Sequence, residues 1–165
     1  MAVLEGGCRC GAVRYAVIGE PVMTALCHCT MCRRSHAAPT VAWAMYRDAE
    51  HAYTKGKPKA YASSPAARRW FCADCGTQLG FTASFIPGLI DIAIGSLDRP
   101  DLVPPALHYW DAERLPWMKF ADGLPVHAAF PPAPGRVRPS RTTRSSAPLP
   151  SGRCRSGGPP SSRAA

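Results

Sequence analysis

The spacing of the cysteines is the feature that most constrains what this chain can fold into. Seven of the eight cysteines fall into three short clusters: a C-x-C at Cys8 and Cys10, a C-H-C-x-x-C at Cys27, Cys29 and Cys32, and a C-x-x-C at Cys72 and Cys75. Such clusters suit tetrahedral Zn²⁺, because one tight turn supplies two thiolates and a second turn completes the site. Three clusters in one short chain therefore predict a zinc protein.

The surroundings of these thiols favour metal binding over disulfides. No stretch of the sequence approaches the ~20 apolar residues of a membrane span. The start of the chain, MAVLEGG, lacks the charged end and apolar run of a secretory signal. We therefore expect a cytoplasmic protein without a membrane partner, whose cysteines stay reduced and available as ligands.

The composition divides the chain at about residue 130. From Pro131 to Ala165 the sequence is almost entirely Pro, Ser, Arg, Gly and Ala, with one Leu, one Val and no aromatic residue. Such a stretch cannot bury enough apolar surface to offset the entropy of ordering it. We expect a zinc-binding domain over residues 1–130 and a disordered, Pro/Ser/Arg-rich tail over residues 131–165.

The net charge belongs mostly to that tail. The whole chain carries 20 basic and 11 acidic residues, and the tail holds seven of the arginines and none of the acids. The domain is then left with 13 basic and 11 acidic residues, a charge of +2. Arginines scattered among prolines are typical of a solvated extension, so we do not expect specific nucleic-acid binding.

Period-2 alternation of apolar residues predicts that the domain is mainly β, with little helix. Five stretches read as strands between Gly, Pro and Ser clusters: residues 12–18, 40–47, 77–83, 89–94 and 106–110. In the fourth stretch the isoleucines alternate and Asp91 faces away from them. One short helical turn is expected after Cys29, through Met31 to Ser35.

The number of clustered cysteines separates two kinds of site. Two pairs make a closed site of four thiolates, which is typical of structural zinc, whereas three ligands and a vacancy are typical of a reactive site. Spacing alone does not say which clusters combine. Joining Cys8 and Cys10 to Cys72 and Cys75 is the simplest pairing, because it leaves the three-cysteine cluster on its own. The tail cysteine, Cys154, is expected to be an incidental thiol.

The three-cysteine cluster could also be a second structural site. Another residue, such as His28 or His36, would then complete it. His28 lies between two of the cysteines, so we expect it on the surface or supporting a ligand. Purely redox-active cysteines are disfavoured, because no C-x-x-C lies in a βαβ context.

A site of three thiolates has a characteristic chemistry. Three thiolates give a Zn²⁺ centre a formal charge of −1, which makes it a poor activator of water but a ready acceptor of another soft thiolate. Arg33 and Arg34 directly follow the cluster. They could offset its charge and bind the carboxylates of an acidic thiol, or they could be ordinary surface arginines.

Several segments together resemble a known family. They are GGCRCGAVRY, CHCTMCRRSHAAP, SSPAARRWFCADCGTQL, IAIGSLDRP and HYWDAERLPWMKFADGLP, in this order over about residues 5–127. This pattern resembles the glutathione-dependent formaldehyde-activating enzymes, a group that includes the centromere protein V domain. The chain departs from the family pattern at position 37, where Ala stands in place of a frequent Gly, and the tail has no counterpart.

The resemblance implies a compact, tent-like β fold of short twisted sheets that holds two zinc ions. It implies a structural zinc on Cys8, Cys10, Cys72 and Cys75, and a catalytic zinc on Cys27, Cys29 and Cys32. In the reaction that names the family, formaldehyde joins the sulfur of glutathione to give S-hydroxymethylglutathione. The same site, acting as a lyase, would break that carbon–sulfur bond.

Three functions are therefore compared. The leading one is a zinc-dependent carbon–sulfur lyase that acts on a thiol adduct, with glutathione or its adduct as the small-molecule partner. The alternative is a non-catalytic zinc module that binds a protein or nucleic acid. Methionine sulfoxide reduction is disfavoured, because it needs a free nucleophilic cysteine in a pocket and Cys154 lies in the tail. The substrate, the direction of the reaction and the oligomeric state stay open.

Overall fold

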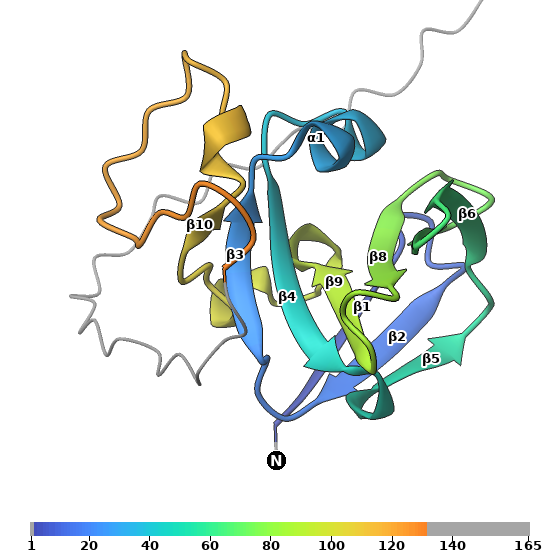
Figure 1. Cartoon of the computed structure of the whole chain (residues 1–165). Coiled ribbons are helices and arrows are strands. Elements are labelled where there is room, and N and C mark those ends of the chain that lie inside the picture. The colour runs from blue at the N-terminus through green and yellow to red at the C-terminus, as the bar shows by residue number, and fades with distance from the viewer. Residues whose placement is uncertain (1, 132–165) are drawn as a thin grey trace, which may run out of the picture.

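A computed structural model describes residues 2–131. The tail was expected over residues 131–165, and all of it after residue 131, including Cys154 and the seven arginines, lies outside this range. Across the described residues the chain is mainly β, as predicted, with two sheets and one short α-helix (Figure 1). No helix in this range is long and apolar enough to cross a membrane.

The two sheets differ in size. The small sheet is antiparallel in the order β1-β2-β5, with β1 at Val3–Gly7, β2 at Arg14–Ile18 and β5 at His51–Lys55. The large sheet has the order β10-β3-β4-β9-β8-β7-β6. Its strands are β3 (Met23–Cys27), β4 (Val41–Arg47), β6 (Lys59–Ser64), β7 (Ala67–Phe71), β8 (Gln78–Ala83), β9 (Leu89–Ala93) and β10 (His108–Tyr109).

The large sheet is buried on both faces near its centre. One face packs against the small sheet, where Val13, Tyr15 and Val17 meet Tyr46 and Ile92. The opposite face forms a second apolar cluster that includes Trp43, Met45, Ala93 and all three cysteines of the middle cluster. Strand β4 serves both cores, since Trp43 and Met45 face one and Ala44 and Tyr46 the other.

A single helix, α1 (Thr30–His36), joins β3 to β4 at one end of the large sheet (Figure 1). Cys29 is its N-cap, with the Sγ atom accepting a hydrogen bond from the Cys32 amide at 3.3 Å. Short 3-10 turns follow several strands: η1 (Asp48–Glu50), η2 (Ile94–Ser96), η3 (Pro100–Leu102) and η4 (Asp111–Glu113).

After η4 the chain folds back over β10, the edge strand beside β3. The His108 amide donates to the carbonyl of Pro125 at 2.8 Å, and the His127 amide donates to the carbonyl of His108 at 2.9 Å. Figure 1 shows this returning segment in orange next to β10. It covers the edge of the sheet beside the middle cysteine cluster.

All five predicted strands are present, each shortened by one to three residues. The predicted helical turn is α1. Five further strands, β1, β3, β5, β6 and β7, were missed. The prediction that Asp91 faces away from the isoleucines was right, but it did not include the burial of Asp91. This residue lies opposite the isoleucines but is only 4% exposed, because that face carries the second core.

Candidate metal centres

The structure brings the first and third cysteine clusters together. The Sγ atoms of Cys8, Cys10, Cys72 and Cys75 all lie within 4.8 Å of one another, although the two pairs are more than sixty residues apart. Each pair lies in a turn with a glycine in the left-handed region, Gly11 and Gly76, both with φ of 73°. This is the simplest pairing expected from the sequence, in which the three-cysteine cluster forms a separate site.

The geometry of these four sulfurs fits a tetrahedral zinc. Zn–S bonds of ~2.3 Å place sulfurs about 3.8 Å apart. The Cys8 and Cys10 sulfurs are 3.5 Å apart, and those of Cys10 and Cys72 are 3.7 Å apart. The Val13 amide donates to Cys8 Sγ at 3.2 Å, and the Thr77 hydroxyl lies 3.2 Å from Cys75 Sγ. Such donors stabilise thiolates, so the donor set suits a closed metal centre.

The middle cluster forms a second centre with three sulfurs. Cys27 ends β3, Cys29 caps α1, and Cys32 lies in the first turn of that helix. Their Sγ atoms lie within 4.8 Å of one another, and within residues 2–131 no His, Asp or Glu ligand atom joins this group. We call these three cysteines the triplet. The donor set fits one Zn²⁺ with its fourth position left for another ligand.

The electrostatics of the triplet favour thiolate at Cys29. Hydrogen bonds from the Cys27 and Cys32 thiols, and another from the Cys32 amide, lower the pKa of Cys29 well below the ordinary thiol value. The contact with Cys29 correspondingly raises the pKa of Cys27. All three cysteines are buried. Three sulfurs at this spacing cannot all ionise without a positive charge close by.

The predicted partners of the triplet make no hydrogen bond to its three sulfurs in the described part of the chain. Arg33 donates to the Thr30 hydroxyl at 3.1 Å, and Arg34 is exposed. His36 Nδ1 contacts the Cys32 carbonyl at 3.1 Å, while its Nε2 is buried without a hydrogen-bond partner. Neither His36 nor His28 joins the group of three sulfurs.

Three neighbours of the triplet were missed by sequence reasoning. Arg69 on β7 donates from Nη2 to Cys32 Sγ at 3.6 Å and is only 3% exposed. Burial, followed by the charges of Asp91, Cys27 and Cys32, raises the pKa of Tyr109 well above its usual value. Asp91 is a polar residue in an otherwise apolar strand, which was the one signal in the sequence that could have marked this site.

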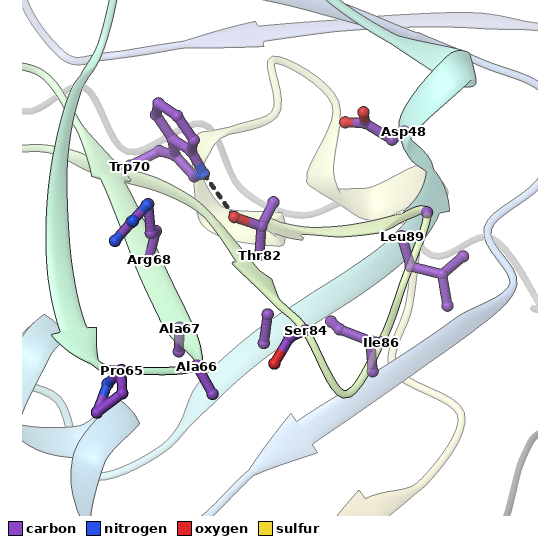
Figure 2. Close-up of a pocket in the computed structure, with 12 residues that line it drawn as sticks. Asp48, Pro65, Ala66, Ala67, Arg68, Trp70, Thr82, Ser84, Ile86 and Leu89 are labelled. Atoms are coloured by element: carbon purple, nitrogen blue, oxygen red, sulfur yellow. Dashed lines mark hydrogen bonds between the residues drawn. The ribbon is translucent and has the colours of Figure 1, made fainter.

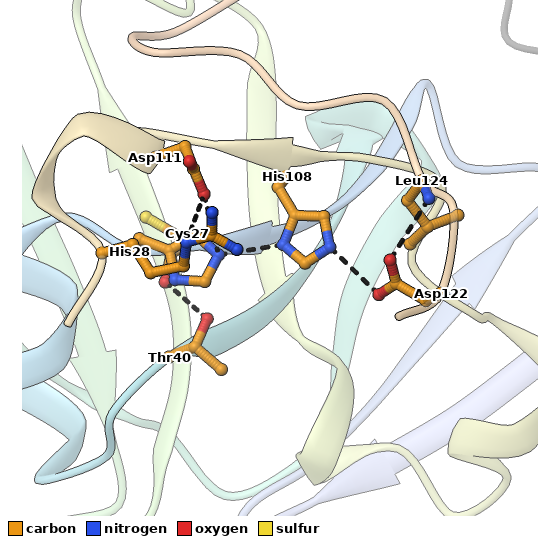
Figure 3. Close-up of polar contacts among 8 residues, drawn as sticks. Cys27, His28, Thr40, His108, Asp111, Asp122 and Leu124 are labelled. Atoms are coloured by element: carbon orange, nitrogen blue, oxygen red, sulfur yellow. Dashed lines mark hydrogen bonds and ion pairs between the residues drawn. The ribbon is translucent and has the colours of Figure 1, made fainter. Parts of the chain in front are cut away.

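His28 is fully buried, so of its two expected positions the surface one is wrong and support of a ligand is left. The segment that returns over β10 encloses it, and the His28 and His108 rings both pack near Phe120. Figure 3 shows the chain of contacts that results: His108 Nε2 lies 3.0 Å from Asp122 Oδ2, and His108 Nδ1 lies 2.9 Å from His28 Nε2. The Asp122 carboxylate can only accept, so His108 Nε2 carries the proton and His108 Nδ1 is an acceptor. His28 Nε2 therefore donates to His108 Nδ1.

This histidine pair also lies close to Asp111, within range for a shared metal. However, the two rings already hydrogen-bond to each other, and Asp111 Oδ1 lies 3.1 Å from Arg114 Nε. Burial lowers the pKa of His28, which keeps the ring neutral. We therefore interpret this group as a support for the loop between Cys27 and Cys29.

Two clefts open on the surface of the described residues. One, of about 440 Å³, lies beside β7 and β8, where Trp70 Nε1 donates to the Thr82 hydroxyl at 3.1 Å (Figure 2). The other, of about 620 Å³, runs from the C-terminal end of α1 to the turn that carries Cys75. His36 and Ala37 line it, but no cysteine of the triplet does.

The fold and the two cysteine centres define a small β protein with two candidate thiolate metal sites. The model of the family described as "Glutathione-dependent formaldehyde-activating enzyme" matches residues 3–113, which is more than half of the chain. The chain belongs to this family. The match confirms the resemblance predicted from the cysteine motifs.

One curated protein and one solved structure are similar to this chain. The chain is 36% identical over 81 residues to a Schizosaccharomyces pombe protein named as an uncharacterized lyase, covering 49% of this chain and 58% of that protein. The chain thus spans less than two thirds of that relative. The fold is similar to the crystal structure of a Rhodobacter sphaeroides protein, with a TM-score of 0.50 and 24% identity over 61% of this chain and 96% of that one.

Proposed function

We propose that this protein is a zinc-dependent carbon–sulfur lyase that acts on a thiol adduct at the triplet. The reaction is of the kind that forms or cleaves S-hydroxymethylglutathione. The observation that carries the proposal is the convergence of three buried cysteine sulfurs without a fourth protein ligand in residues 2–131, beside a separate closed group of four. The family and the lyase-named relative support an enzyme, and the thiol chemistry is our inference.

The two groups of cysteines would have different roles. Cys8, Cys10, Cys72 and Cys75 would hold a structural zinc that ties the start of the chain to its middle. Cys27, Cys29 and Cys32 would hold the second zinc, which when bound lowers the pKa of a thiol ligand. In the synthetic direction the substrate sulfur adds to the carbonyl carbon of formaldehyde, and the thiol proton ends on the new hydroxyl group. Cleavage reverses each of these changes.

The protein contributes the arrangement of these groups. The contacts of His28 with His108 hold the loop between Cys27 and Cys29, and the helix fixes Cys32 against it. Arg33 lies half-buried in the same helix, and together with exposed Arg34 it would bind the carboxylates of an acidic thiol such as glutathione. The body of such a substrate would fit the cleft of about 620 Å³ beside His36, one turn beyond Cys32.

The test is the turnover of formaldehyde and glutathione by the full-length protein, measured as the rate above the uncatalysed reaction by exchange NMR. Cys27→Ser should lower the catalysed rate by about 100-fold or more, because losing a ligand should cost at least as much as the ~10- to 100-fold loss seen when a partner of a ligand is removed. Cys154→Ser is the matched control and should retain the full rate. If Cys27→Ser turned over as fast as the control, the proposal would be wrong.

A second candidate, a zinc module without catalytic activity, is favoured by one observation. Each cysteine of the triplet is less than a tenth exposed, and none lines either cleft. This module would hold zinc at the triplet and show no turnover with any glutathione adduct. Both candidates hold zinc at the triplet, so turnover measured on protein shown to carry two zinc ions separates them.

A further inference from the structure

One buried cation lies directly against the triplet. Arg69 Nη2 donates to Cys32 Sγ at 3.6 Å, and the guanidinium carbon lies 5.0 Å from the centroid of the Phe81 ring. Within residues 2–131, no other guanidinium donates a hydrogen bond to a triplet sulfur. Arg33 and Arg34, which the sequence suggested for this role, make no such contact.

The sheet itself holds Arg69 in this place. Arg69 on β7 pairs with Phe81 on β8, and Phe81 pairs with Asp91 on β9. Residues that pair across strands point to the same face, so these three side chains form a row beneath α1. The row belongs to the face that carries the triplet, because Cys32 and Phe81 pack in the same apolar cluster.

No carboxylate in the described part of the chain forms an ion pair with Arg69. No acidic oxygen there lies within 4.0 Å of its guanidinium, and its Nη1 atom is buried without a partner. Burying an unpaired charge costs several kcal/mol, and a nearby opposite charge offsets this cost. The triplet is the nearest group that can supply the negative charge.

We propose that Arg69 is the residue that compensates the charge of the triplet and so selects an anionic fourth ligand. This rests on the proposed function, because it assumes a metal at the triplet. Three thiolates and a dication sum to −1, and an anionic fourth ligand would lower the total charge to −2. Arg69 brings these totals to 0 and −1. A neutral fourth ligand leaves the charge of the site at −1 without Arg69 and at 0 with it. The charge of Arg69 therefore favours binding of an ionised thiol over binding of a neutral donor.

Binding of a fourth ligand tests this role without any turnover. Full-length protein is loaded with Co²⁺, whose visible spectrum reports the sulfur and nitrogen ligands of the metal. It is titrated separately with glutathione, which binds as a thiolate, and with imidazole, which binds as a neutral donor. The closed four-cysteine centre has no position for either ligand, so spectral changes report on the triplet.

Arg69→Gln should bind glutathione roughly 10- to 100-fold more weakly, the size expected from one charge at this range in a protein interior. Its affinity for imidazole should change less than about threefold, because no charge is added. Arg69→Lys keeps the charge and should recover most of the glutathione affinity. Arg68→Gln, the neighbouring exposed arginine on the same strand, should bind both ligands as the parent protein does.

Two results would overturn the proposal. One is an Arg69→Gln protein that holds its metal and binds glutathione like the parent. The other is an equal loss of both ligands with Arg69→Gln that Arg69→Lys does not restore, which would show a role in packing. Both outcomes differ from a failure of the proposed function, in which the parent protein binds thiols at the metal but turns none over.

Discussion

At the scale of single residues, the two cysteine sites differ in how exposed their cysteines are and in which charged residues lie beside them. The closed centre has two exposed members, Cys10 and Cys75, and lies on turns at the surface. The triplet is buried against an apolar core and needs charge compensation from within the protein. Arg69, Asp91 and Tyr109 surround it, so the chemistry of this site depends on residues of three different strands.

Asp91 gives a prediction about pH at this scale. Burial, more than any neighbouring charge, raises its pKa to about 7. The unfolded value is about 3.9, so the native state holds this proton more tightly. The contribution of Asp91 to stability is therefore greatest below about pH 4 and is lost as the pH rises towards 7. Asp91→Asn removes this dependence.

We expect Asp91→Asn to gain about 1–2 kcal/mol relative to the parent protein between pH 5.5 and pH 7.5. The free energy of unfolding in urea, measured for both proteins at each pH, gives this difference and cancels any acid release of metal. The exposed Asp101→Asn should show no such trend. A constant difference between Asp91→Asn and the parent across this range would contradict the account.

At the scale of elements, the helix α1 carries a local strain at its end. Ala37 follows the helix in the left-handed region with φ of 48°, and its amide donates to the carbonyl of Arg33. Only glycine adopts this conformation without a steric cost from its side chain. This is the position where the family pattern has a frequent Gly, and the structure supplies the reason for that preference.

Ala37→Gly should therefore stabilise the protein by about 0.5–1 kcal/mol, because the gain from relieving the left-handed Cβ exceeds the entropic cost of glycine. The matched control is Ala38→Gly, at a residue without a positive φ, which should destabilise by a similar amount. The free energy of unfolding in urea, measured for the parent and both variants at one pH, gives the two differences. A loss of stability in Ala37→Gly would refute the strain at this cap.

Alternation predicted strands such as β4 and β9, in which large apolar residues recur at every second position. Strand β3 reads MTALC and was missed because small and polar residues interrupt that pattern, although most of its side chains are buried. Strand β6 was missed because most of its side chains are exposed. The stretch with Ile90, Ile92 and Ile94 was found, and its acid stood out in the sequence. The burial of that acid could not be predicted from local sequence, because the second core comes from distant segments.

At the scale of the whole molecule, the cysteine clusters identified the two candidate centres, but only the fold showed what surrounds them. The pairing of the outer clusters follows from the meeting of two turns, one after β1 of the small sheet and one between β7 and β8 of the large sheet. The burial of His28 depends on the segment after η4, which returns across β10 more than eighty residues later. No spacing rule links these segments, since their contact is decided by the packing of the sheet edge.

The account depends on two thiolate metal centres in one chain, and counting zinc tests this most directly. Zinc per chain is measured by elemental analysis in the full-length protein, in Cys27→Ser and in the control Cys154→Ser. The account predicts two zinc ions in the parent and the control, and one in a folded Cys27→Ser protein. One zinc ion in all three proteins would contradict it, because the triplet would then hold no stable metal.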